Sequence, residues 1–209
     1  MMEKTQYKEF GWSEQSSIPY FNDIFKYIID LLPRDGSPIL DIGCGNGFMD
    51  NVLISMGFNI YGIDASEQGV ALANRNYPNH FFVKDITSSE LPQELKDIPF
   101  KTIISTEVIE HLYSPASFTA FVKSILVANG GGTFILTTPY YGYLKNIVLA
   151  LFNKMDHSFS ALWEGGHIKF WSRKTITILL QNAGFRNIKF KGTGRCRFIW
   201  RHMIIKGEI

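Results

Sequence analysis

Apolar residues along the chain follow two periods, and segments of the two kinds alternate. Short apolar runs predict buried strands, and apolar positions three and four residues apart predict helices. A first helix is expected over 18–32, where Pro33 ends it. The other predicted helices are 48–56, 66–76, 115–128 and 172–182, and the predicted strands are 38–42, 58–63, 80–83, 100–105, 133–137, 185–191 and 197–205.

The ends and the order of these elements predict the architecture. Ser66, Ser114 and Ser172 precede predicted helices, where a serine hydroxyl accepts a hydrogen bond from an unpaired first-turn N–H. Strands that alternate with helices favour a doubly wound, mostly parallel α/β sheet. Only residues 192–194 join the last two strands, and so short a connection predicts an antiparallel hairpin.

Length and composition agree with a globular α/β protein. The 209 residues suffice for one domain, expected over 1–209 with a lid-like insertion at about 140–166. With 45% hydrophobic and 19% charged residues the chain is not of the disordered type. Cys44 and Cys196 are too few for a disulfide framework. No apolar run approaches the ~20 residues of a membrane span, and no signal peptide is recognisable, so a cytoplasmic protein is expected.

The formal net charge of +2 conceals an uneven distribution of charge. Residues 1–165 carry 11 basic and 18 acidic groups, whereas residues 166–209 carry 10 basic groups and a single acid, Glu208. The basic end suits a phosphorylated or carboxylated substrate, or acidic lipid headgroups. DNA is not expected, and RNA is disfavoured because no aromatic and basic RNA-binding module accompanies the charges. The alternative is a sheet edge that charge protects against aggregation. Strand periodicity groups these charges by face: Lys189 with Lys191, and Arg195 with Arg197 and Arg201.

A glycine-rich segment follows the first predicted strand and reads Asp41-Ile42-Gly43-Cys44-Gly45-Asn46-Gly47. Glycine allows a sharp turn and the close approach of a ligand. A strand end that meets a helix N-terminus in an α/β sheet is where nucleotides bind. Phe48 stands where a dinucleotide-binding loop needs its third glycine, and no Lys-Ser or Lys-Thr pair of a phosphate-binding loop follows.

Two further acids stand at the ends of the next predicted strands. Asp64 ends the second strand, where a carboxylate can accept both hydroxyls of a ribose. Asp85 follows the third strand, at the level expected for an adenine amino group. Each acid alone is more typical of a solvated turn or a helix cap. Together with Asp41 they favour a cationic nucleoside ligand that lacks phosphates.

In these features the chain resembles the class I S-adenosylmethionine-dependent methyltransferases, from about residue 18 onward. The resemblance implies a Rossmann-like sheet of seven strands with a C-terminal antiparallel hairpin. It also implies that the glycine segment binds the methionine end of S-adenosylmethionine, that Asp64 binds the ribose and Asp85 the adenine, and that S-adenosylhomocysteine is the product. The implied cofactor-binding residues are Asp41, Gly43, Cys44, Gly45, Gly47, Asp64, Ala65, Asp85, Ile86 and Thr106.

The segment after the fourth predicted strand reads Glu107-Val108-Ile109-Glu110-His111-Leu112. It lacks the Asn-Pro-Pro-Tyr-like sequence typical of methyltransferases that act on adenine or amide nitrogen, which argues against that chemistry. The segment is similar to that of the ubiquinone-biosynthesis O-methyltransferases. A comparable Glu-x-x-Glu-His sequence binds a divalent metal in small-RNA 2′-O-methyltransferases.

Three interpretations of this segment remain open. In a helical turn Glu107, Glu110 and His111 would point one way and suit Mg²⁺, Mn²⁺ or Zn²⁺, with His167 as a fourth ligand. Such a metal would lower the pKa of a substrate hydroxyl. Alternatively, Glu110 orients His111 as a metal-free general base. In the third interpretation these residues only pack and cap.

The lid-like insertion is rich in aromatic residues, which suits an aromatic or lipidic acceptor. Tyr140, Trp163 and His167 are expected in the acceptor wall. The apolar run 147–152, flanked by lysines, is consistent with a transient contact at a membrane surface or with an ordinary packed helix.

The expected activity is S-adenosylmethionine-dependent methyl transfer to a small-molecule acceptor, with oxygen as the favoured acceptor atom. The expected catalytic residues are His111, Glu110 and His167. The alternatives are methylation of a carbon or nitrogen of a sugar, lipid or secondary metabolite, and a non-catalytic scaffold that binds S-adenosylmethionine.

Overall fold

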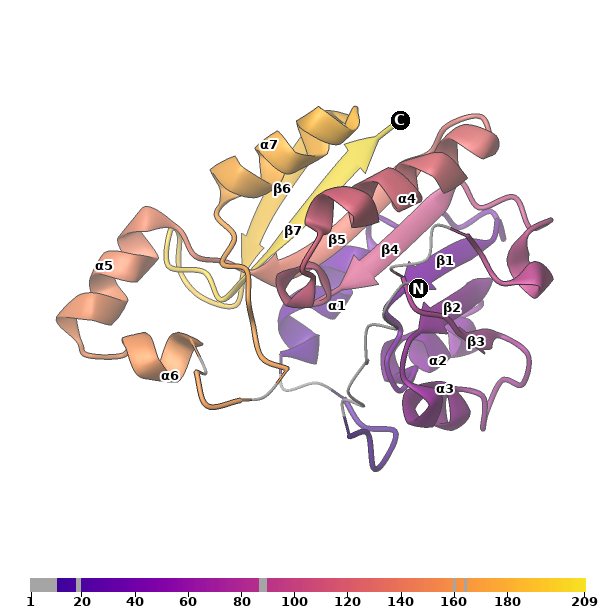
Figure 1. The fold of residues 1–209 in the computed structure, drawn as a ribbon, viewed down its shortest axis with the longest axis horizontal. Helices are drawn as coiled ribbons and strands as arrows, with labels where there is room; N and C mark the ends of the chain where they lie inside the picture. The colour runs from indigo at the N-terminus through magenta and orange to yellow at the C-terminus, as the bar shows by residue number, and fades with distance from the viewer. Residues whose placement is uncertain (1–10, 18–19, 87–89, 160, 164) are drawn as a thin grey trace, which may run out of the picture.

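The computed structural model describes residues 11–17, 20–86, 90–159, 161–163 and 165–209. Its centre is one seven-stranded sheet with the strand order β3-β2-β1-β4-β5-β7-β6 (Figure 1). Neighbouring strands from β3 to β5 are parallel, and β7 runs antiparallel to both β5 and β6. The predicted doubly wound sheet with a C-terminal antiparallel hairpin is confirmed.

Strands and helices alternate from β1 to β5, as the apolar pattern predicted. The strands are β1 (Ile39–Ile42), β2 (Ile60–Asp64), β3 (Phe81–Val83), β4 (Thr102–Thr106), β5 (Thr133–Pro139), β6 (Arg186–Thr193) and β7 (His202–Glu208). The α-helices are α1 (Phe21–Ile29), α2 (Phe48–Ser55), α3 (Glu67–Ala73), α4 (Pro115–Ala128), α5 (Tyr143–Leu151), α6 (Met155–Phe159) and α7 (Arg173–Ala183). Two short 3-10 turns are η1 (Gln93–Leu95) and η2 (Ile109–His111). The predicted start of the first helix at 18 lies outside the described residues.

The predicted serine caps are present. Ser66, Ser114 and Ser172 each accept a hydrogen bond from the backbone N–H three residues later, at the starts of α3, α4 and α7. Gly184 ends α7 in the left-handed conformation that glycine adopts most easily. Local signals of this kind explain why most helix ends could be predicted within one or two residues.

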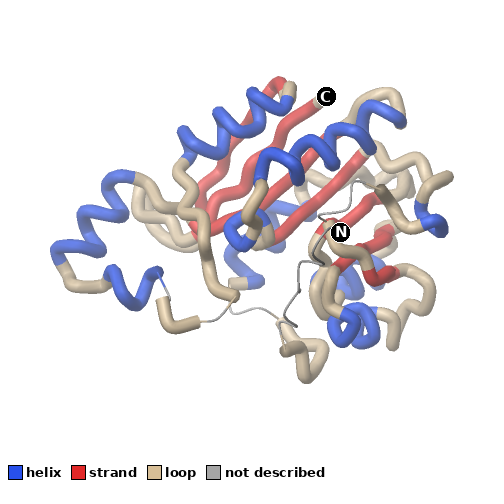
Figure 2. Tube along the Cα trace, viewed as in Figure 1, coloured by secondary structure: helices blue, strands red, loops and turns tan. Residues whose placement is uncertain are grey.

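The sheet is a single layer between helices on both faces (Figure 2). Alternate residues of a strand point to opposite faces of the sheet, and the residues of β1 therefore contribute to the cores on both faces. Leu40 and Ile42 pack in the core under α4 and α7, whereas Ile39 packs in the core under α1 and α2. All four residues of β1 are buried, which fits a central parallel strand.

The C-terminal hairpin differs from its prediction in length. β6 continues through Gly192 to Thr193, and β7 begins at His202, so residues 194–201 form the connection. A Cβ at Gly192 would overlap the ring of Trp200, so this glycine extends β6 by letting Trp200 pack on it. The predicted strand start at 197 is therefore wrong, and Arg195, Arg197 and Arg201 lie in the connection rather than on one face of a strand.

The inserted segment after β5 contains α5 and α6, which stand at one end of the molecule (Figure 1). Within the described ranges, none of the helices is both long enough and apolar enough to cross a membrane. Lys145, which the sequence placed beside an apolar membrane-facing run, is buried.

Candidate functional site

The glycine segment forms a tight turn between β1 and α2, which begins at Phe48. Gly43 has a φ of +87°, where a side chain is strained, and a Cβ there would overlap Val108, just beyond β4. Its N–H donates to the Ile63 carbonyl of β2 at 2.8 Å. The segment thus lies where the carboxyl ends of β1, β2 and β4 meet, which is the ligand-binding edge of doubly wound sheets.

Asp64, the last residue of β2, connects the glycine segment to the start of α3. Its Oδ2 accepts a hydrogen bond from the Gly45 N–H and its Oδ1 accepts one from the Ser66 N–H, both at 2.8 Å. A carboxylate can accept about four hydrogen bonds. These contacts fix the carboxylate at the end of β2, and binding of a ribose by Asp64 stays a prediction.

The other residues of the predicted cofactor set lie at the same edge of the sheet. Cys44 packs beside the small core under α3. Ala65 precedes the cap of α3, Asp85 and Ile86 follow β3, and Thr106 ends β4. All five side chains are partly buried. The structure brings them to neighbouring strand ends, and their binding of the cofactor stays a prediction.

A pair of buried carboxyl groups lies behind the glycine segment. Asp41 of β1 is 2% exposed and Asp50 of α2 is 1% exposed. Burial raises the pKa of both, that of Asp50 to about 7, and the charge of Asp50 raises the pKa of Asp41 further. Because burial favours the neutral form of a carboxyl group, this pair holds protons up to a higher pH than solvated aspartates do. Nothing in the sequence pattern distinguished Asp50.

Residues 11–17, called the strap below, cross the glycine segment. Asn46 Nδ2 donates a hydrogen bond to the Ser16 carbonyl at 3.0 Å. The indole of Trp12 lies so close to the loop that a Cβ at Gly45 would come within 2.9 Å of it. Figure 1 shows the strap (indigo) beyond the strand ends. It was not predicted, because no apolar period marks it.

The segment after β4 departs from the predicted helical turn. Glu107 has a φ of +56° and precedes η2, so it does not share a face with Glu110 and His111. Its Oε1 accepts a hydrogen bond from the Thr137 hydroxyl at 2.8 Å, and its Oε2 lies 3.0 Å from His202 Nδ1. The expectation that all three side chains point one way is therefore wrong, because a left-handed residue reverses the chain before the turn begins.

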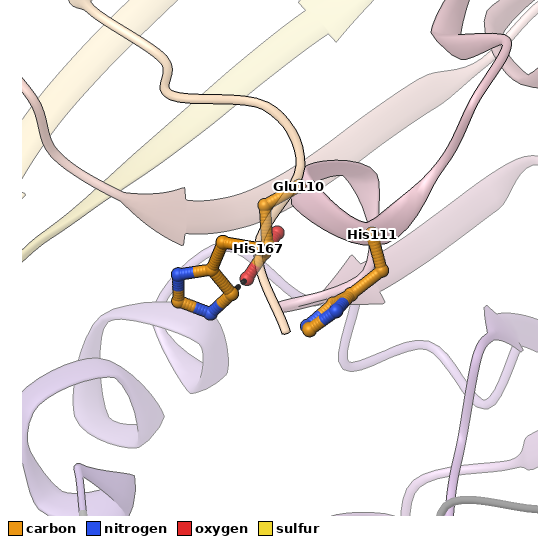
Figure 3. A group of neighbouring side chains, drawn as sticks. All are labelled: Glu110, His111 and His167. Carbon is orange, nitrogen blue, oxygen red and sulfur yellow. Dashed lines mark ion pairs between the residues drawn. The ribbon is translucent and has the colours of Figure 1, made fainter. Parts of the chain in front are cut away.

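Glu110, His111 and His167 come together at the end of β4 (Figure 3). One ligand atom from each lies within 4.8 Å of the others. Glu110 is fully buried, and its Oε2 accepts a hydrogen bond from the Thr138 hydroxyl at 3.0 Å. Its Oε1 lies 3.9 Å from His167 Nε2, which reaches the group from the segment after the lid helices. The structure therefore places these three predicted residues close together in space.

Backbone contacts fix the orientation of His111. Its Nδ1 lies 2.8 Å from the Gly165 carbonyl oxygen and 3.2 Å from that of Gly166. A carbonyl oxygen only accepts, so Nδ1 carries a proton, and in the neutral ring Nε2 is the nitrogen with the free lone pair. The two N–H groups just beyond His167 donate to the Glu110 carbonyl, at 2.9 and 3.0 Å. The returning lid segment is therefore tied to η2.

The chemistry of this group fits a divalent metal. Burial, and then the charge of Glu107, raise the pKa of Glu110. Burial, and then the charge of His111, lower the pKa of His167 to about 4. Glu110 Oε1 and His167 Nδ1 are buried without a hydrogen-bond partner, which is costly unless a ligand satisfies them. A carboxylate and two neutral imidazoles suit Zn²⁺ or Mn²⁺. Ligand atoms that bind one ion at about 2.1 Å lie roughly 3–4 Å from one another. Small side-chain rotations would bring the three ligand atoms, now within 4.8 Å, to that separation.

Two residues that the sequence did not single out border the same site. His202, the first residue of β7, is 7% exposed, and its ring centroid lies 4.4 Å from that of Tyr20. Burial, and then the charges of Glu107 and Glu110, raise the pKa of Tyr20. Because β7 runs antiparallel to β5, its first residue lies at the carboxyl ends of the parallel strands. The predicted antiparallel hairpin already implied that the last strand begins at this edge of the sheet. Because that strand was predicted to start at 197, His202 was not recognised as its first residue.

Known methyltransferases match this chain in sequence and in fold. A family model described as a methyltransferase domain matches residues 19–189. The ubiquinone biosynthesis O-methyltransferase of Pseudomonas aeruginosa is 26% identical over 176 residues, covering 78% of this chain and 75% of that protein. The mitochondrial ubiquinone biosynthesis O-methyltransferase of Arabidopsis thaliana is 31% identical over 103 residues, covering 47% of this chain and 31% of that protein. The crystal structure of a SAM-dependent methyltransferase from Archaeoglobus fulgidus has the same fold, with a TM-score of 0.66 at 15% identity, covering 89% of this chain and 93% of that one.

The family match spans most of the chain, and the strand order and antiparallel hairpin agree with it. The alternative of a non-catalytic scaffold is thereby set aside. The chain belongs to the class I S-adenosylmethionine-dependent methyltransferases and is an enzyme of that family.

Proposed function

We propose that the enzyme transfers the methyl group of S-adenosylmethionine to an oxygen of a small molecule, assisted by a divalent metal on Glu110, His111 and His167. The observation that carries the proposal is the convergence of these side chains beside the glycine segment. Val108, in the same short segment, packs against Gly43 and so joins the two parts of the site. The relatives named as O-methyltransferases support oxygen as the acceptor atom.

The residues divide the work between holding the cofactor and preparing the acceptor. The glycine segment and Asp64 would hold the cofactor with its methyl group toward the acceptor, and such positioning supplies much of the rate. Thr138 holds one oxygen of Glu110 and leaves the other free for a ligand. Two lid carbonyls keep His111 Nδ1 protonated, which is the usual support for a metal-binding imidazole. When bound, the metal lowers the pKa of a substrate hydroxyl.

The test is methyl transfer to a catechol by chelator-treated enzyme, measured as S-adenosylhomocysteine released. We expect Mg²⁺, Mn²⁺ or Zn²⁺ to restore activity. Glu110→Gln and His167→Asn should lose roughly 100-fold of the activity, the scale of lost proton-transfer assistance. His157→Asn is the matched control, since His157 is exposed on α6. Calorimetric titration of Mn²⁺ into the same variants measures metal binding without an acceptor.

Two results would change the proposal. Full activity of the chelated enzyme would remove the metal and leave His111 as a general base whose Nε2 is free to take the proton. A product that carries the new methyl group on carbon or nitrogen, seen by mass spectrometry and NMR, would contradict oxygen as the acceptor atom.

A further inference from the structure

A buried lysine lies in the lid without a partner of opposite charge. Lys145, in the first turn of α5, is only 9% exposed, although lysine is among the residues least often buried. Its Nζ lies 4.7 Å from the centroid of the Tyr141 ring. Within the described ranges, neither an ion pair nor a hydrogen bond involves its ammonium group.

An ammonium group on a largely buried side chain, without an anionic partner, is unfavourable for the folded protein. Burial, which disfavours the charged form, and then the charge of Arg195 lower the pKa of Lys145 to about 8. The contact with Tyr141 offsets part of that cost through a cation–π interaction. A ligand that brings a negative charge would supply the missing partner.

The ammonium group lies near the proposed acceptor site. Nζ lies over the ring of Tyr141, which comes three residues after the Thr138 whose hydroxyl donates to Glu110, and the charges of Glu107 and Lys145 act on each other. The ring of Tyr141, over which Nζ lies, is close to two further rings, with centroid separations of 5.7 Å to Phe159 and 5.0 Å to Phe170. An apolar aromatic wall with one buried cation suits an aromatic acceptor that carries one anionic group.

We propose that Lys145 binds a carboxylate on the methyl acceptor, so that the enzyme prefers carboxylated acceptors to neutral ones. The buried ammonium matches the single charge of a carboxylate, because Arg195 and Arg201, whose charges also act on Lys145, are exposed and screened by water. The inference rests on the proposed methylation of a small acceptor and names its chemical class.

The experiment measures binding to the enzyme loaded with S-adenosylhomocysteine, by calorimetry. The probes are 3,4-dihydroxybenzoate and 4-methylcatechol, which share both hydroxyls and differ in the carboxylate. Wild type should bind the benzoate about tenfold more tightly than 4-methylcatechol, because one well-placed charge interaction contributes on that scale. Lys145→Met, uncharged and of similar length, should equalise the two probes. Lys154→Met, at an exposed lysine just beyond α5, should keep the preference.

Equal binding of the two probes by wild type would overturn the inference, and so would a preference that survives Lys145→Met. Tighter binding of 3,4-dihydroxyphenyl phosphate than of the benzoate would overturn the carboxylate assignment. Thermal melts test whether a lost preference in Lys145→Met comes from misfolding. Because the substitution removes a largely buried charge without a partner, the melting temperature of the variant should equal or exceed that of wild type. If the benzoate binds through Lys145 and receives its methyl group on carbon, oxygen fails as the acceptor atom and the inference stands.

Discussion

Asp41 and Asp50 are both buried behind the glycine segment, and their raised pKa values make stability depend on pH. Burial raises the pKa of Asp50 from 3.8 to about 7 on folding. Between these values the folded chain holds more protons than the unfolded chain, so the free energy of unfolding falls as the pH rises. We expect this pair to cost on the order of a few kcal/mol of stability between about pH 4 and about pH 7.

Asp50→Asn tests this expectation, because the amide cannot titrate and still donates a hydrogen bond to Asp41. In thermal melts at about pH 8 the variant should unfold at a higher temperature than wild type, and its melting temperature should vary less across the acidic range. Asp97→Asn, at an exposed turn, should keep the wild-type dependence. If Asp50→Asn also keeps the wild-type pH dependence of the melting temperature, groups other than Asp50 cause that dependence.

At the scale of elements, the strap covers the glycine segment without belonging to a helix or a strand. Trp12 lies against Gly45, and Asn46 ties the strap down through Ser16. An indole offers a large apolar surface to a ligand, so we expect Trp12 to contact the bound cofactor. Trp12→Ala should weaken S-adenosylhomocysteine binding roughly tenfold in calorimetry, and binding should change the tryptophan fluorescence of wild type more than that of the variant.

Phe198→Ala is the control for this prediction, since Phe198 is an exposed aromatic residue in the hairpin connection. That variant should bind the cofactor product as wild type does. Unchanged affinity and an unchanged fluorescence response in Trp12→Ala would show that the strap lies outside the cofactor site.

Elements with local signals were predicted well, and contacts between distant segments were not. The serine caps and the first five strands follow from neighbouring residues, and Asp64 reaches its place because it ends a strand. The hairpin was misjudged because its register depends on Trp200 packing over Gly192. In the apolar pattern Lys145 only flanks the run 147–152, and the tertiary structure shows that it is buried.

At the scale of the whole molecule, the lid and the basic connection form one end (Figure 1). Helix α5 exposes Tyr143 and Leu151, and Phe152 just beyond it is exposed as well. Large apolar side chains gathered on one exposed segment mark an interaction surface. The neighbouring connection, residues 194–201, carries three arginines, which anionic lipid headgroups attract.

We therefore expect wild type to float with vesicles that contain phosphatidylserine, and to float less with neutral phosphatidylcholine vesicles or at high salt. The double variant Leu151→Glu, Phe152→Glu should reduce the bound fraction several-fold, because charged groups do not enter the apolar boundary of a bilayer. Val127→Glu alters a similarly exposed apolar residue on α4 and should not change it. If wild type stays unbound even by anionic vesicles, the lid meets its acceptor in water, and the carboxylate bound by Lys145 belongs to a water-soluble molecule.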